Sequence, residues 1–253
     1  MINLTGRRTL ITGGSRGIGR AAALLFAEAG SDVAITYQCR EEAALEVRSA
    51  VEKIGRNCFT YKVELSSEDQ VRSLAAALAE RWGGLDALVN NAGIWTPLEM
   101  GAGDAEAWRE TMAVNLDGLF YLVDAVLPLL KARPRSAIVN VGSTAGIRGE
   151  AFHSHYAASK GAMNALTKSW AVEFAPWNIN VNCVAPGWVD TDMCTGVFGD
   201  AAYRESVRQS IPLKRIPPPE DIAGPILFLA SDLARHITGA VLSVNGGGVL
   251  CGA

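Results

Sequence analysis

The stretch "ITGGSRGIGR", residues 11–20, has four glycines in ten positions and decides how the rest of the chain is interpreted. Its glycines follow the apolar run "TLIT" (9–12) and precede an alanine- and leucine-rich helical pattern. A glycine loop between a first strand and a first helix lets backbone N–H groups approach a pyrophosphate, which the helix N-terminus also attracts. The spacing Gly13-x-x-x-Gly17-x-Gly19 differs from the commoner Gly-x-Gly-x-x-Gly, so the loop alone fits a plain tight turn equally well.

The remaining sequence alternates short β-branched runs with longer helical periods, which is typical of successive βαβ units around a parallel sheet. The pattern predicts seven strands, over residues 9–12, 32–37, 58–65, 86–90, 136–142, 178–184 and 240–244. It predicts helices over residues 17–29, 41–54, 67–82, 105–132, 155–175 and 219–230. The sequence therefore predicts an α/β protein, and at 253 residues one domain spanning 1–253.

Two places interrupt this regular pattern. Pro128 falls inside the long segment 105–132, so we expect a bend or an early end of the helix there. Residues 187–219 form the least regular region, which closes on three consecutive prolines. Long irregular segments in compact domains are often lids or binding loops, so we expect a substrate loop in this region.

The composition excludes several classes of protein. The net charge of −3, without a Lys/Arg-rich run, gives no footprint for nucleic acid. The five cysteines (39, 58, 183, 194 and 251) are odd in number and include no Cys-x-x-Cys pair, which indicates reduced thiols and no metal site. An apolar leader with a cleavage site and a run of about 18 apolar residues are both lacking. We therefore expect a cytoplasmic protein without membrane or nucleic-acid partners.

Four further stretches bear on the glycine loop: "LVNNAGI" (88–94), "AVNLDG" (113–118), "VGSTAG" (141–146) and "HYAASKGA" (155–162). The first follows the fourth predicted strand, where the carboxyl ends of parallel strands border a ligand crevice. Asn115 lies within a helical period, and Ser143 lies just beyond the fifth strand. Tyr156 and Lys160 are four residues apart on a helix and therefore share one face. Alone, such a pair is usually a solvated surface contact, but the upstream Ser143 favours a catalytic group.

With these motifs the sequence resembles the short-chain dehydrogenase/reductase family over essentially its whole length. The order of the motifs and the ending "ITGAVLSVNGG" are most similar to its 3-oxoacyl-[acyl-carrier-protein] reductase branch. The resemblance implies a single-domain Rossmann fold, a doubly wound seven-stranded parallel sheet with helices on both faces. It also implies a catalytic tetrad of Asn115, Ser143, Tyr156 and Lys160, and a homotetramer that acts on a small carbonyl or alcohol substrate.

The tetrad residues suit the reduction of a ketone, which needs a hydride donor, a proton donor and a group that holds the developing oxyanion. By the resemblance, Tyr156 donates the proton and Ser143 hydrogen-bonds the carbonyl oxygen. Lys160 binds the nicotinamide ribose, and its cation, with the oxidised nicotinamide, favours the phenolate form of Tyr156. Asn115 holds a water that links Lys160 to solvent.

The resemblance also implies residues that contact the cofactor, from the glycine loop to the segment "APGWVDTDM" (185–193). They are Gly13, Ser15, Arg16, Gly17, Ile18, Gly19, Tyr37, Gln38, Arg40, Glu64, Leu65, Asn91, Ala92, Gly93, Tyr156, Lys160, Pro186, Gly187, Val189 and Thr191. Glu64 departs from the family, which usually has Asp or Asn beside the adenine.

NADP(H) is the expected cofactor. Tyr37 ends the second strand where an NAD enzyme usually has an acid, so no charge there repels a 2′-phosphate. Arg16 can bind the phosphate bidentately, and Arg40 can assist. The alternative for Arg16 is a pair with a surface carboxylate, and Asp190 and Asp192 are expected in a solvated loop.

Aromatic residues near the tetrad predict the substrate pocket. Trp95, Trp188, His153, Ser143 and Tyr156 are expected to line it, with His155 beside His153 at its mouth. Two other functions remain open. A nucleotide-binding relative without turnover usually lacks one tetrad residue, and a glycine-loop methyltransferase leaves Tyr156 and Lys160 unexplained.

Overall fold

The computed structural model describes residues 2–249, so the predictions for Cys251 and for both ends of the domain 1–253 lie outside it. Seven strands form one parallel sheet in the order β3-β2-β1-β4-β5-β6-β7. Their bounds are β1 Arg8–Ile11, β2 Asp32–Tyr37, β3 Cys58–Lys62, β4 Ala87–Asn90, β5 Ser136–Val141, β6 Ile179–Pro186 and β7 Val241–Val244. This is the doubly wound Rossmann arrangement, and the predicted fold class is confirmed.

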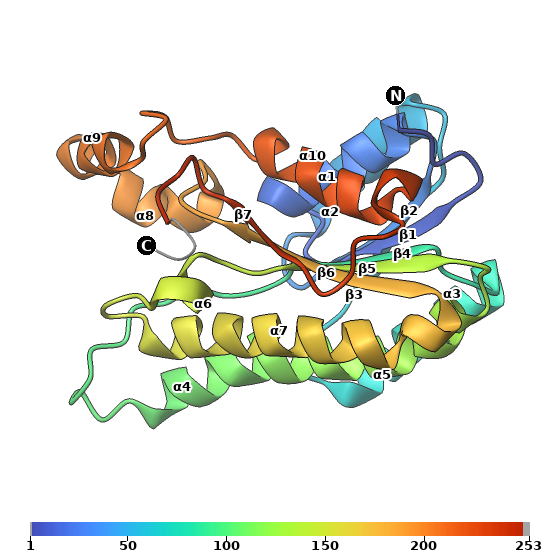
Figure 1. Cartoon of the computed structure of the whole chain (residues 1–253), viewed down its shortest axis with the longest axis horizontal. Coiled ribbons are helices and arrows are strands. Elements are labelled where there is room, and N and C mark those ends of the chain that lie inside the picture. Colours follow the sequence, from blue (N-terminus) through green and yellow to red (C-terminus); the bar gives the residue numbers. More distant parts are fainter. Residues whose placement is uncertain (1, 250–253) are drawn as a thin grey trace.

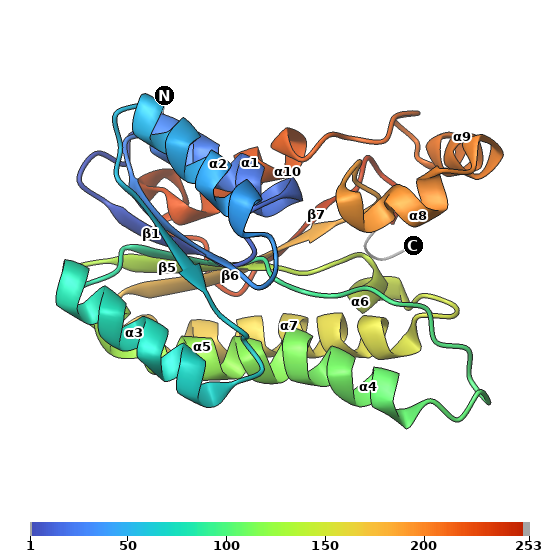
Figure 2. The same ribbon diagram turned by 180° about the vertical axis from the view of Figure 1, so that it is seen from behind.

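Helices cover both faces of the sheet (Figures 1 and 2). One face carries α1 Gly17–Glu28, α2 Glu41–Lys53 and α10 Glu220–Ala230. The other carries α3 Glu68–Trp82, α5 Gly118–Lys131 and α7 Ser154–Glu173. Because the strands are apolar on both sides, each layer has its own core: Phe26 and Ile35 belong to the first, and Leu122 and Ile138 to the second.

The segment predicted as one helix over 105–132 is continuous but not uniform. It comprises α4 Ala105–Met112, a π-helical stretch Ala113–Asp117 and α5. The helix does not end at Pro128, because α5 continues for three residues to Lys131. By length and composition alone this helix could cross a membrane, with a mean hydropathy of 1.6. Its apolar side packs in the core through Leu122, Val126 and Leu130, so the fold accounts for that apolar character.

The segment 187–219, expected to be the least regular, contains two short helices, α8 Thr195–Phe198 and α9 Ala201–Ser210, which project beyond the sheet (Figure 1). Its role as a substrate loop stays a prediction. The Asp200 carboxylate accepts hydrogen bonds from the N–H groups of Ala202 and Tyr203 and so starts α9. Few apolar side chains mark these short helices, and they pack in a small cluster of Cys194, Phe198, Val207 and Ile211.

Candidate active site

The glycine loop after β1 fits a pyrophosphate. Gly13 and Gly17 have positive φ, and a Cβ on Gly19 would lie 2.3 Å from the Gly13 carbonyl oxygen. The N-cap side chain of Arg16 makes no capping hydrogen bond, and the first turn of α1 has no acidic residue. The first turn of α1 itself therefore carries no negative charge that would oppose an anion at its N–H groups.

Asn91 fixes the loop against β4. Its side-chain amide donates to the carbonyl oxygens of Thr12 (2.9 Å) and Gly13 (3.2 Å). The Thr12 hydroxyl in turn accepts from the N–H groups of Asn91 and Ala92, each at 2.9 Å. The "NNAG" stretch thus joins the loop to the carboxyl end of the neighbouring strand.

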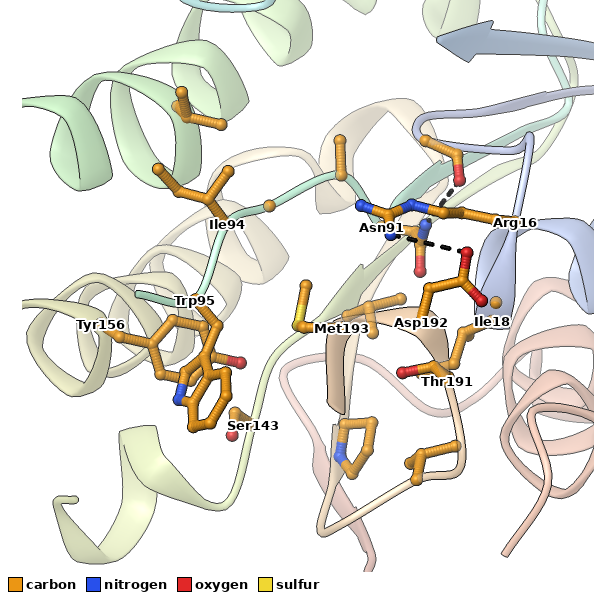
Figure 3. A pocket seen from close by; sticks show the side chains of 18 of the residues that line it. Arg16, Ile18, Asn91, Ile94, Trp95, Ser143, Tyr156, Thr191, Asp192 and Met193 are labelled. Atoms are coloured by element: carbon orange, nitrogen blue, oxygen red, sulfur yellow. Dashed lines mark hydrogen bonds and ion pairs between the residues drawn. The ribbon is translucent and has the colours of Figure 1, made fainter. Parts of the chain in front are cut away.

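An arginine pair lies beside this loop, and it holds a carboxylate that the sequence did not place there. Arg40 donates to Asp192 over 3.0 Å, and Arg16 lies 3.7 Å from the same carboxylate oxygen (Figure 3). Asp190 pairs with Arg204. Both aspartates are about half exposed, as expected of a solvated loop, but each is paired with arginine. The surface-carboxylate alternative for Arg16 describes this structure.

The end of β2 contains no acid on the cavity wall, as the sequence indicates. Tyr37 is largely buried, and burial, followed by interaction with Glu41, raises the pKa of its phenol. The neighbouring Gln38 donates to Glu64, whose carboxylate also accepts from the Ser66 hydroxyl over 2.8 Å. Glu64 lies on the cavity wall in this arrangement, and contact with adenine stays a prediction.

One cavity of about 340 Å³ runs from this region to the tetrad, within the range of small-molecule and cofactor sites. Arg16, Ile18 and Thr191 lie at one end and Ser143, Tyr156 and Trp95 at the other (Figure 3). The wall includes every residue predicted to bind cofactor or substrate except two, Gly19 and His153, and it also lacks the tetrad residue Asn115. Gly19 packs beneath the loop instead, against Gly13.

Ser143 and Tyr156 interact directly at the far end. Burial raises the pKa of the Tyr156 phenol to about 12, and a hydrogen bond with Ser143 opposes this shift. Lys160 Nζ lies 5.8 Å from the Tyr156 ring centroid and donates to the Val141 carbonyl oxygen over 2.8 Å. Stabilisation of the Tyr156 phenolate by this cation stays a prediction.

Lys160 is almost completely buried, and its pKa is lowered to about 8 because burial disfavours the ammonium. A buried lysine with one backbone partner retains two donor positions. These positions suit the ribose hydroxyls of a bound nucleotide, because Lys160 also lines the cavity.

Asn115 lies in the π-helical stretch and is buried behind the wall. Its carboxamide oxygen accepts from the Ile94 N–H over 2.8 Å, and its amide donates to the Ile94 carbonyl oxygen over 3.0 Å. Asn115 therefore holds the chain after "NNAG" in place. A role for Asn115 in binding a water stays a prediction.

The aromatic residues are arranged differently from the prediction in one respect. Trp95 and Trp188 line the cavity, with ring centroids 5.9 Å apart and planes at 86°. His153 does not line it, because it stacks behind Trp95 at 4.3 Å. His155 is fully buried beside Thr96, and burial lowers its pKa, so it does not form the mouth of a pocket.

Several wall residues were missed by sequence reasoning. Thr144, Arg148 and Glu150 line the cavity from the segment between Ser143 and Tyr156, and Asp192, Met193 and Cys194 line it from the segment after β6. The first group could have been predicted from the sequence, because the short connection between the catalytic residues Ser143 and Tyr156 has to pass beside the site. Within residues 2–249, no group of His, Cys, Asp and Glu could hold a metal ion, and Cys39, Cys58, Cys183 and Cys194 are free thiols.

Comparison with known proteins agrees with this geometry. The family described as enoyl-(acyl carrier protein) reductase matches residues 13–248. The 3-oxoacyl-[acyl-carrier-protein] reductase FabG of Thermotoga maritima is 37% identical over 249 residues, 98% of this chain and 100% of that protein. The protein with the same name from Aquifex aeolicus is 38% identical over 97% of this chain and 98% of its own length.

Solved structures are similar over nearly the whole chain. The short-chain dehydrogenase/reductase of Brucella melitensis named glucose/ribitol dehydrogenase has a TM-score of 0.92 at 35% identity, covering 99% of both chains. The Pseudomonas aeruginosa RhlG/NADP active-site complex has a TM-score of 0.91 at 35% identity, covering 98% of both chains. The chain therefore belongs to the short-chain dehydrogenase/reductase family of oxidoreductases.

Proposed function

We propose that the chain is an NADP(H)-dependent reductase that converts a ketone to a secondary alcohol, or catalyses the reverse reaction. One observation carries the proposal. Ser143 and Tyr156 share a cavity with the glycine loop and with Arg16 and Arg40, so a proton donor and a dinucleotide site open onto the same space.

The residues have separable roles. The N–H groups at the start of α1 hold the pyrophosphate, Arg16 and Arg40 hold the 2′-phosphate, and Lys160 binds ribose hydroxyls. Bound NADPH supplies the hydride that adds to the carbonyl carbon. Ser143 donates a hydrogen bond to the carbonyl oxygen, and Tyr156 transfers its phenolic proton to that oxygen and then regains a proton from solvent.

The substrate is proposed to be small and neutral around its carbonyl, a class that includes 3-oxoacyl esters and thioesters. The names of the 3-oxoacyl-[acyl-carrier-protein] reductases to which the chain is similar support this class. A cytoplasmic location and a homotetramer remain expectations from the sequence.

The test is a spectrophotometric assay of NADPH oxidation with β-keto esters, diketones and keto sugars. We expect at least one neutral β-keto ester to be reduced to its alcohol. Tight NADPH binding without oxidation by any of these compounds would instead favour the nucleotide-binding relative without turnover.

A further inference from the structure

We propose that Glu150 selects the substrate. Its carboxylate accepts a hydrogen bond from a hydroxyl or amine group next to the reacting carbonyl, and it excludes substrates that carry a carboxylate or phosphate at that position. The proposal rests on the carbonyl reductase activity proposed above.

Glu150 reaches the site through a turn between α6 Ala145–Arg148 and α7. Gly149 ends α6 with φ 79°, a conformation that favours glycine, and its N–H donates to the Ala145 carbonyl oxygen over 2.9 Å. Glu150 follows directly and lines the same cavity as Ser143 and Tyr156.

The carboxylate of Glu150 is held in place. Its side chain is 17% exposed, and its Oε1 accepts from Trp95 Nε1 over 3.2 Å. The backbone keeps the two segments together, because the Leu98 N–H donates to the Phe152 carbonyl oxygen over 2.7 Å. Glu150 and Trp95 therefore form one pre-ordered wall, which reduces the entropy that substrate binding would otherwise lose.

This carboxylate has spare acceptor capacity. A carboxylate has about four lone-pair sites, and among residues 2–249 the indole N–H of Trp95 is the one side-chain donor within hydrogen-bond distance of it. His153 Nδ1 is 3.8 Å away, too far for a hydrogen bond. A largely buried acceptor is favourable only when it is paired, so a donor group on the substrate is stabilised there.

The charge of Glu150 acts on the reacting centre. Burial is the main cause of the raised pKa of Tyr156, and the negative charge of Glu150 adds to it, so the two groups interact electrostatically. Arg148 lines the same cavity but is exposed, so solvent and salt screen its charge. A second anion beside the carbonyl would therefore be repelled by the Glu150 carboxylate.

Trp95 and Trp188 add a preference for substrates with an apolar body. The indoles of Trp95 and Trp188 meet nearly at right angles and give the pocket apolar walls. A substrate with an apolar body and one hydroxyl or amine near the carbonyl matches these walls and Glu150 together.

Two matched pairs of ketones test the proposal on the wild-type chain. In the first, 4-hydroxybutan-2-one is compared with pentan-2-one, which replaces the hydroxyl with a methyl group. In the second, ethyl 3-oxobutanoate is compared with the 3-oxobutanoate anion. We expect kcat/KM to be about tenfold or more higher for the first member of each pair, because a buried polar group left unpaired discriminates strongly.

Glu150→Gln keeps an oxygen that can accept from Trp95 but removes the charge. The ratio of kcat/KM for the ester to that for the acid should fall about tenfold, and the ratio for the hydroxyketone to that for pentan-2-one about threefold. The pH profile of ester reduction should shift to lower pH, because the Glu150 charge no longer raises the pKa of Tyr156. Glu99→Gln is the matched control, because Glu99 is an exposed acid on the neighbouring loop outside the cavity wall. It should leave both ratios unchanged.

Equal rates within both wild-type pairs would overturn the proposal. So would a Glu150→Gln variant that slows all four ketones equally, because Glu150 would then only position Trp95. If no ketone is reduced, the proposed function fails. The role of Glu150 is then tested by calorimetry, as the ratio of dissociation constants within each of the two pairs.

Discussion

Arg40 donates a 3.0 Å hydrogen bond to Asp192, which lies 152 residues later in the chain. Arg16 lies 3.7 Å from the same carboxylate oxygen. Asp192 begins the short turn that leads into α8, so this carboxylate joins the proposed 2′-phosphate site to the segment 187–219. A 2′-phosphate that binds both arginines has to compete with Asp192.

Replacing Asp192 by Asn should therefore strengthen NADPH binding. All three side chains are about half exposed, and such ion pairs are worth about 1 kcal/mol or less. The dissociation constant for NADPH, measured by fluorescence titration, should fall by up to about fivefold, while that for NADH stays the same. Weaker NADPH binding would show that Asp192 supports the cofactor site and does not compete in it.

Arg16→Gln should have the opposite effect. If the arginine makes one charge-assisted contact with the 2′-phosphate, NADPH affinity should fall by about tenfold or more and NADH affinity should change little. Arg20→Gln is the matched control, because Arg20 is an exposed arginine of α1 outside the cavity wall. A wild-type kcat/KM with NADH equal to or better than that with NADPH would contradict the cofactor assignment.

The sequence predicts the sheet because strand periodicity is local, and most cavity residues follow from the family resemblance that the glycine, Ser143 and Tyr156 motifs carry. It does not predict the pairing of Arg40 with Asp192, since that contact depends on how the segment after β6 folds back. The sequence also does not predict that His153 lies behind Trp95, because closeness to Tyr156 in the sequence does not determine which way the His153 side chain points. The helices α8 and α9 were missed because short polar helices have little apolar periodicity.

Buried Lys160 should make stability depend on pH. Its pKa is lowered to about 8 in the folded chain from an ordinary 10.5, so between these values the unfolded chain binds more protons and stability rises with pH. Relative to Lys160→Met, the wild-type free energy of unfolding should increase by about 3 kcal/mol from pH 7 to pH 10.5. Urea denaturation across this range checks it, and parallel curves for the two proteins would show that Lys160 remains charged when folded.

The chain should form a homotetramer. Phe120 on α5 is 52% exposed and Val172 on α7 is 78% exposed, and α7 has small residues at Ala158 and Ala165 that permit close helix approach. Light scattering should give about four times the 26.8 kDa mass of the chain. Phe120→Lys and Val172→Lys should reduce that mass, whereas a stable wild-type monomer at micromolar concentration would refute the assembly.

The proton-donor role of Tyr156 is the central claim, and Tyr156→Phe tests it most directly. The substitution keeps the ring and removes the hydroxyl that interacts with Ser143. With a ketone that the wild type reduces, kcat should fall about a hundredfold or more, because a positioned general acid contributes at least that much, while the NADPH dissociation constant stays within about twofold. Lys160→Ala should instead lower kcat and weaken NADPH binding. If Tyr156→Phe retains more than about a tenth of the wild-type kcat, another group donates the proton and the account is wrong.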